Sequence, residues 1–144
     1  MDSSLILAKK HYNGKVILTG EHTILYGGEA LVTPINCGIT ISVTHGEGIV
    51  KTNSGNESII NLRRENSLFN TAIELLEKEF KVKTSCIDLL VETNLPIGGF
   101  GSSSAFITSL IESILQFYGI FLTEKELIEY VIWIESRLGS EVSG

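Results

Sequence analysis

The chain has 144 residues, which is enough for one domain with a hydrophobic core but not for two. Its composition, 43% apolar and 19% charged, is ordinary for a globular protein. The net charge of −6, without a block of Lys and Arg, argues against a nucleic-acid-binding face and against an anionic membrane surface. We therefore expect neither nucleic acid nor membrane as a partner.

Cysteine usage and hydropathy predict the compartment. Cys37 and Cys86 are isolated in strand-like segments, a pattern typical of buried thiols in a reducing compartment. Lys9, Lys10 and His11 interrupt the only early apolar run, and no apolar stretch reaches the length of a membrane span. We expect a cytoplasmic protein without a signal peptide.

The first half of the chain has the pattern of β structure. Residues 5–7 predict a short edge strand, and residues 14–20 predict a strand on which Lys15, Ile17 and Thr19 share one face. Further strands are predicted over residues 30–35, 39–44, 49–52 and 58–62, and the one over 39–44 is expected to be half-buried. The turn residues between them predict a meander of antiparallel hairpins.

The second half alternates helices with one strand. Asn66 or Ser67 can cap a helix that reaches residue 80, and a strand is predicted over residues 86–92. A long, mostly buried helix follows over residues 105–118 and ends at Gly119. This mixture predicts an α+β fold with antiparallel strands packed against helices.

A last helix is predicted by a capping box that Thr123 forms with Glu126. Its buried stripe is expected to contain Ile128, Val131 and Ile132. The next position of that stripe, seven residues after Ile128, is Glu135. A carboxylate there either faces a partner or reaches water at a frayed helix end, and the residues alone leave both readings open.

A glycine- and serine-rich loop, residues 94–106 (NLPIGGFGSSSAF), separates the predicted strand from the long helix. Glycines let the backbone approach a ligand closely, and a helix N-terminus presents free N–H groups and the positive end of the helix dipole. A Gly/Ser linker with a serine cap is the alternative. Because linkers usually have polar flanks and this loop lies between two apolar elements, we interpret it as a nucleotide-phosphate loop.

Three features could serve one site: Lys15 on a strand, the glycine-serine loop and Glu135. A bound triphosphate needs N–H donors, a lysine, and Mg²⁺ held by oxygen ligands such as a serine hydroxyl and a carboxylate. The loop is not a Walker A loop, because no Gly-Lys-Ser/Thr follows its glycines. It also lacks the spacing and the βαβ context of the dinucleotide fingerprint.

Two segments resemble motifs of the GHMP small-molecule kinases, most closely of the mevalonate kinases among them. Residues 14–27, GKVILTGEHTILYG, are similar to the family's first motif, P-G-K-V-x-L-x-G-E-H-x-V-x-Y/H-G. Residues 95–105, LPIGGFGSSSA, are similar to the second, P-x-G-x-G-L-G-S-S-A-A. The resemblance covers residues 1–144 as the family's N-terminal, ATP-binding domain, without its C-terminal domain.

The resemblance implies a fold like ribosomal protein S5 domain 2, a non-Walker ATP site, and phosphoryl transfer from ATP to an alcohol. Lys15 matches the family lysine near the reacting hydroxyl, and Ser103 and Glu135 match the two Mg²⁺ ligands. Glu21, His22 and Ser143 match residues at the acceptor site. The residues that match the triphosphate loop are Gly98, Gly99, Gly101, Ser102, Ser103 and Ser104.

The expected acceptor is mevalonate or a related isoprenoid-pathway acid. Galactokinases carry Arg where Lys15 stands and continue Glu-His-Thr with Asp-Tyr, whereas Ile24 and Leu25 follow here. Asn13 replaces the motif's proline, and the loop is one residue shorter, so that Ser102 and Ser103 could exchange roles. The aspartate of the family's S-G-x-D is absent, so we expect this chain alone to be inactive and its exposed apolar surface to favour a homo-oligomer.

Other functions stay open. A GHMP-fold ligand-binding or sensor protein would fit the missing aspartate, and a GHMP sugar kinase is a further alternative. A serine hydrolase using Ser102 to Ser104 would need a G-x-S-x-G motif and an orienting context for a histidine, and the sequence supplies neither.

Overall fold

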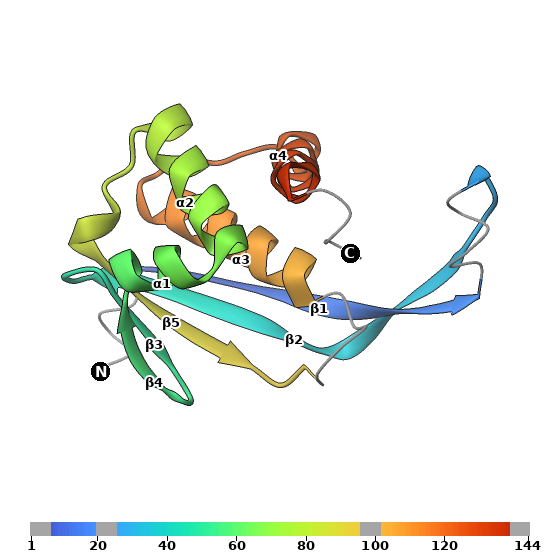
Figure 1. Cartoon of the computed structure of the whole chain (residues 1–144), viewed down its shortest axis with the longest axis horizontal. Helices are drawn as coiled ribbons and strands as arrows, with labels where there is room; N and C mark the ends of the chain where they lie inside the picture. Colours follow the sequence, from blue (N-terminus) through green and yellow to red (C-terminus); the bar gives the residue numbers. More distant parts are fainter. Residues whose placement is uncertain (1–6, 20–25, 96–101, 139–144) are drawn as a thin grey trace.

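A computed structural model describes residues 7–19, 26–95 and 102–138 (Figure 1). In chain order the elements are β1 (Ala8–Thr19), β2 (Leu31–His45), β3 (Ile49–Thr52), β4 (Gly55–Ser58), α1 (Ile59–Glu65), α2 (Ser67–Phe80), a 3-10 turn (Thr84–Cys86), β5 (Ile87–Thr93), α3 (Ser102–Phe117) and α4 (Glu124–Arg137). No helix within the described ranges combines the length and the apolar character needed to cross a membrane.

Five strands form one mixed sheet in the order β1-β2-β5-β3-β4. Neighbouring strands are antiparallel except β3 and β5, which run parallel with Val50 opposite Leu89. Helices α2, α3 and α4 lie above one face of this sheet, and α3 is the helix that packs on β1 and β2 (Figure 1). The predicted α+β class, an antiparallel-rich sheet covered by helices, is therefore confirmed.

The core lies between the sheet and α3. On β2 the side chains of Ile39, Ile41 and Val43 are buried, as predicted. The expected half-buried strand is wrong at Ser42 and Thr44, which are buried too. The helices supply fully buried side chains from α2 and α3, namely Phe69, Ile73, Leu76, Ile107, Leu110, Ile111 and Ile114. Each large apolar side chain buried in this layer contributes about 1.5–3 kcal/mol, and together they hold α3 on the sheet.

The predicted meander is wrong in three respects. Residues 30–35 and 39–44 were predicted as separate strands but form one strand, β2. β5 lies between β2 and β3, so the first and second hairpins do not pair with each other. Residues 58–62 were predicted as a strand, but the strand ends at Ser58 and α1 begins at Ile59. The Ser58 hydroxyl accepts a hydrogen bond from Asn61 N at 3.1 Å, which caps the helix.

The predicted helix starts of α2 and α4 are confirmed. The Asn66 side chain caps α2 by accepting from Phe69 N at 3.0 Å. At α4, Thr123 accepts from Glu126 N, and the Glu126 carboxylate accepts from Thr123 N, which completes the capping box. Gly119 follows α3 with a φ of 75°, a left-handed conformation that glycine adopts without strain.

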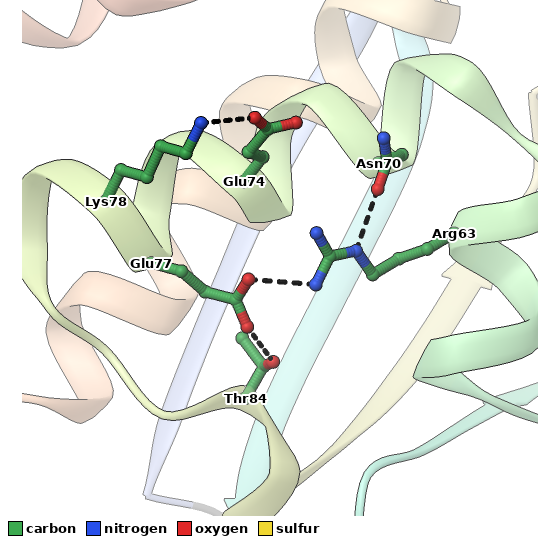
Figure 2. Close-up of polar contacts among 6 residues, drawn as sticks. All are labelled: Arg63, Asn70, Glu74, Glu77, Lys78 and Thr84. Carbon is green, nitrogen blue, oxygen red and sulfur yellow. Dashed lines mark hydrogen bonds and ion pairs between the residues drawn. The ribbon is translucent and has the colours of Figure 1, made fainter.

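A polar network fixes the layer of α1 and α2 over the 3-10 turn (Figure 2). Arg63 of α1 donates to Asn70 Oδ1 and to Glu77 Oε1 of α2, both at 2.8 Å. The other Glu77 oxygen accepts from the buried Thr84 hydroxyl at 2.9 Å. One carboxylate thus joins three segments, because both of its oxygens are bonded to different elements.

Two expectations about burial are wrong. Cys86 is exposed and Cys37 is half-buried, and both are free thiols. Ile128 and Ile132 of α4 were expected in the core but are 49% and 59% exposed, while Leu127 and Ile134 supply the buried contacts of α4. The reason is that α4 packs on α2 and α3 and makes no extensive contact with the sheet.

Candidate functional site

The N-terminal turn of α3 is the element that organises the site. α3 has 16 residues from Ser102 and carries no acidic residue in its first turn. Its free N–H groups and its positive dipole end are therefore not neutralised locally by a carboxylate of that turn. Ser104, Thr108 and Glu112, spaced four residues apart, lie along one side of the helix and line the same cleft.

Glu135 is paired with this side of α3. The Ser104 hydroxyl donates a hydrogen bond to Glu135 Oε1, and both side chains are half-buried. Glu135 is therefore not at a frayed helix end, and the first of the two readings of its position holds. The contact places a hydroxyl oxygen and a carboxylate oxygen side by side at the first turn of α3.

A cleft of about 550 Å³ opens beside this pair, between β1, α3 and α4. Its apolar wall is formed by the α4 side chains Leu127, Ile128, Val131 and Ile132. The exposed positions Ile128 and Ile132 belong to this wall. An apolar cleft with a few convergent polar groups is the usual form of a small-molecule site.

Tyr12 and Glu112 line the cleft as well, and with Lys10 they form a second polar cluster. The Tyr12 hydroxyl donates to Glu112 Oε1 at 2.6 Å, and Lys10 Nζ lies 3.7 Å from the same oxygen. Burial, followed by the hydrogen bond to Glu112 and the charges of Glu112 and Glu124, raises the pKa of Tyr12 well above its usual range. The phenol consequently stays protonated and donates throughout the physiological pH range.

The structure brings together only some of the predicted site residues. Lys15 lies in β1 with Pro34 opposite it in the ladder, and Ser102 and Ser103 open α3. The partner of Glu135 is Ser104, one residue beyond the predicted Mg²⁺ ligand Ser103, whose role stays a prediction. Six predicted residues lie outside the described ranges: Glu21, His22, Gly98, Gly99, Gly101 and Ser143.

Sequence reasoning missed Tyr12 and Glu112. Glu112 lies eight residues after Ser104 and is the one charged residue of α3, and this is the signal that could have found it. Tyr12 gives no comparable signal, because a tyrosine in a strand is ordinary.

The paired oxygens suit Mg²⁺ better than a softer metal. Among residues 7–19, 26–95 and 102–138, no three His, Cys, Asp or Glu side chains gather to hold a metal ion. Mg²⁺ does not need such a cluster, because it typically binds one or two protein oxygens and completes its octahedron with phosphate oxygens and water. Ser104 and Glu135 fit that requirement as an all-oxygen pair.

Comparison with known proteins gives a consistent picture. Residues 67–144 match the family described as GHMP kinases N terminal domain, which is more than half of the chain. A mevalonate kinase from Archaeoglobus fulgidus is 26% identical over 132 residues, which are 91% of this chain and 45% of that protein. The chain thus spans about half the length of the curated relatives it matches.

Two solved structures show the same fold. The Methanococcus jannaschii mevalonate kinase superposes with a TM-score of 0.75 at 21% identity, over 91% of this chain and 46% of that one. The Streptococcus pneumoniae phosphomevalonate kinase in complex with phosphomevalonate and AMPPNP superposes with a TM-score of 0.74 at 16% identity, over 94% and 44%.

Proposed function

The chain belongs to the GHMP kinase family, and on that premise we propose that it binds Mg-ATP for phosphoryl transfer to a small-molecule alcohol. We propose further that it is the nucleotide-binding, N-terminal domain of a longer enzyme. The acceptor that we favour is mevalonate or a related acid, because the curated relative above is a mevalonate kinase and the first motif lacks the galactokinase residues.

The observation that carries the proposal is the hydrogen bond between Ser104 and Glu135 at the mouth of the cleft. It joins the N-terminal turn of α3, which attracts anions, to a carboxylate from a helix 31 residues further along the chain. Once phosphate is bound at this helix end, its negative charge would repel the nearby Glu135 carboxylate unless a cation lies between them. A bound Mg²⁺ would supply that charge and neutralise the developing charge on the transferred phosphoryl group.

Each of the candidate site residues then has a defined role. Glu135 and a serine of the first α3 turn, Ser104 or the predicted Ser103, would hold the metal ion. The first-turn N–H groups of α3 would bind phosphate oxygens, and Lys15 would balance charge as the acceptor oxygen forms its bond to the γ-phosphorus. The acceptor hydroxyl would lose its proton to water or to a general base of the longer protein, the bond between the γ-phosphorus and the bridging oxygen would break, and ADP would be the leaving group.

Isothermal titration calorimetry of the chain tests nucleotide binding directly. We expect uptake of Mg-ATP and much weaker uptake of ATP in EDTA, because the carboxylate repels uncomplexed phosphate. Equal affinity under both conditions, or no binding, would contradict the proposal.

Turnover is tested in the longer protein with Mg-ATP and mevalonate, phosphomevalonate or galactose as the acceptor, by measuring ADP release. Lys15→Met should lower kcat roughly 100-fold or more while nucleotide affinity changes little, since Lys15 acts mainly on developing charge. Unchanged turnover would remove Lys15 from the mechanism, and Lys125→Met, on the first turn of α4, is the matched control.

A further inference from the structure

The junction of β1 with α3 carries an interaction that the phosphoryl-transfer site does not itself require. Glu112 accepts the Tyr12 hydroxyl and lies next to Lys10, so that one carboxylate on α3 joins two side chains of β1. Its side chain is only 26% exposed. An apolar residue could fill this part of the helix without the desolvation penalty of a half-buried charge, so the carboxylate has a purpose other than packing.

Tyr12 lies in β1 just before a register shift in the pairing of β1 with β2. The ladder with β2 is regular up to Asn13, which lies opposite Gly38, but Lys15 lies opposite Pro34. β2 therefore carries two additional residues across this step. Beyond it the two strands extend past the helical layer (Figure 1). The segment with Lys15 thus resumes its pairing with β2 directly after an irregularity in the ladder.

The junction is held on both faces of the sheet. On the helix side, Tyr12 is bonded to Glu112. On the open side, the ring nitrogens of His11 contact Thr40 Oγ1 and Asn13 Oδ1, each at 2.7 Å. Between them the backbones are so close that a Cβ added to Gly38 would lie 2.3 Å from the Tyr12 carbonyl oxygen. The register shift between β1 and β2 therefore follows directly after a closely packed and hydrogen-bonded pair of strand segments.

We propose that Tyr12 and Glu112 are positioning residues for phosphoryl transfer: their hydrogen bond holds the strand segment that carries Lys15 against the helix that carries Ser104. This inference rests on the proposed function. It connects the two ends of the site mechanically, because Tyr12 is three residues before Lys15 and Glu112 is eight residues after Ser104. Neither residue needs to touch the substrate.

The test combines Tyr12→Phe, Glu112→Ala and Glu112→Gln in the longer protein, with Tyr130→Phe as the matched control. Tyr130 is a half-buried tyrosine of α4 that packs on Phe80, away from β1. Hydrogen exchange of the amides of residues 13–19 is compared with that of residues 39–43 in β2. kcat and the KM for Mg-ATP are measured on the same preparations.

We expect Tyr12→Phe and Glu112→Ala to speed amide hydrogen exchange selectively in residues 13–19. The same variants should lower kcat roughly 10- to 100-fold with the KM for Mg-ATP almost unchanged, because small misplacements of catalytic groups have effects of this size. Glu112→Gln should recover much of the loss, since its amide oxygen still accepts from Tyr12. Tyr130→Phe should behave like the parent.

If Tyr12→Phe and Glu112→Ala left the exchange of residues 13–19 unchanged, or raised exchange equally across the chain, the inference would be overturned. Faster exchange confined to residues 13–19 together with a normal kcat would overturn it as well. A parent enzyme that transfers no phosphate to any alcohol would overturn the proposed function and the positioning role with it. Normal parent turnover with unaffected variants would overturn the positioning role alone.

Discussion

Replacement of Glu135 by glutamine isolates the charge of the candidate metal ligand from its packing. The glutamine side chain would keep an oxygen that accepts from the Ser104 hydroxyl, so the contact between α3 and α4 should survive. The melting temperature should therefore change by less than about 4 °C, the shift that corresponds to about 1 kcal/mol in a domain of this size.

The affinity for Mg-ATP should fall much more than the stability. Interactions with a charged group contribute about 1.5–3 kcal/mol, and each 1.4 kcal/mol is about a tenfold change in Kd. Because Glu135 is half-buried, solvent screens it incompletely, and we expect Kd for Mg-ATP to rise roughly 10- to 100-fold. The loss should disappear when ATP is titrated in EDTA.

Calorimetric titration with and without Mg²⁺ measures both quantities, and Glu129→Gln provides the control. Glu129 is an exposed carboxylate on the same helix, so its removal makes the same change in net charge outside the cleft. Parent-like affinity of Glu135→Gln for Mg-ATP would refute the assignment of Glu135 as a metal ligand. An equal loss in EDTA would show that the residue acts on the nucleotide without the metal.

Four further predictions concern the scaffold. Phe69→Ala, at a fully buried position, should lower the free energy of unfolding by about 3–5 kcal/mol in urea titrations. Glu77→Ala should lower it by about 1–3 kcal/mol, because the buried Thr84 hydroxyl loses its acceptor. Gly38→Ala should lower the melting temperature, since β1 and β2 must separate to admit the methyl group. The hydrogen bonds with the Thr123 backbone and side chain lower the pKa of the Glu126 carboxyl below its ordinary value of 4.5. The ionised carboxylate therefore stabilises the folded chain above pH 4.5, and this contribution is lost as the pH falls through the lowered pKa. Glu126→Gln should flatten this part of the acid unfolding curve.

Local patterns predicted the elements whose determinants lie close together in the sequence. The capping residue Asn66 and the capping box of Thr123 each act within a few residues, and the structure agrees with both. The alternation along β2 correctly predicted that Ile41 and Val43 are buried, but Ser42 and Thr44 on the other face are buried as well. Residues 58–62 were mistaken for a strand because so short an apolar run fits either period, and only the cap from Ser58 favours a helix.

What the sequence could not supply is the arrangement between elements. Ile128 and Ile132 have the spacing of a buried stripe, but the packing of α4 leaves them on a cleft wall. The choice between Ser103 and Ser104 as the neighbour of Glu135 depends on a helix rotation of about 100° for each residue. The Tyr12–Glu112 bond joins residues 100 positions apart and has no local signature.

The position of β5 has a consequence for how the polypeptide acquires its shape. It is the last strand to be synthesised among the described residues, yet it occupies the middle of the sheet. While a ribosome is still making α1 and α2, the β1–β2 and β3–β4 hairpins have no ladder in common, and each keeps an open edge. Residues 87–93 join them in one step that must bring distant parts of the chain together, which is a slow event. Nascent chains that end before residue 87 should therefore be the species that chaperones retain.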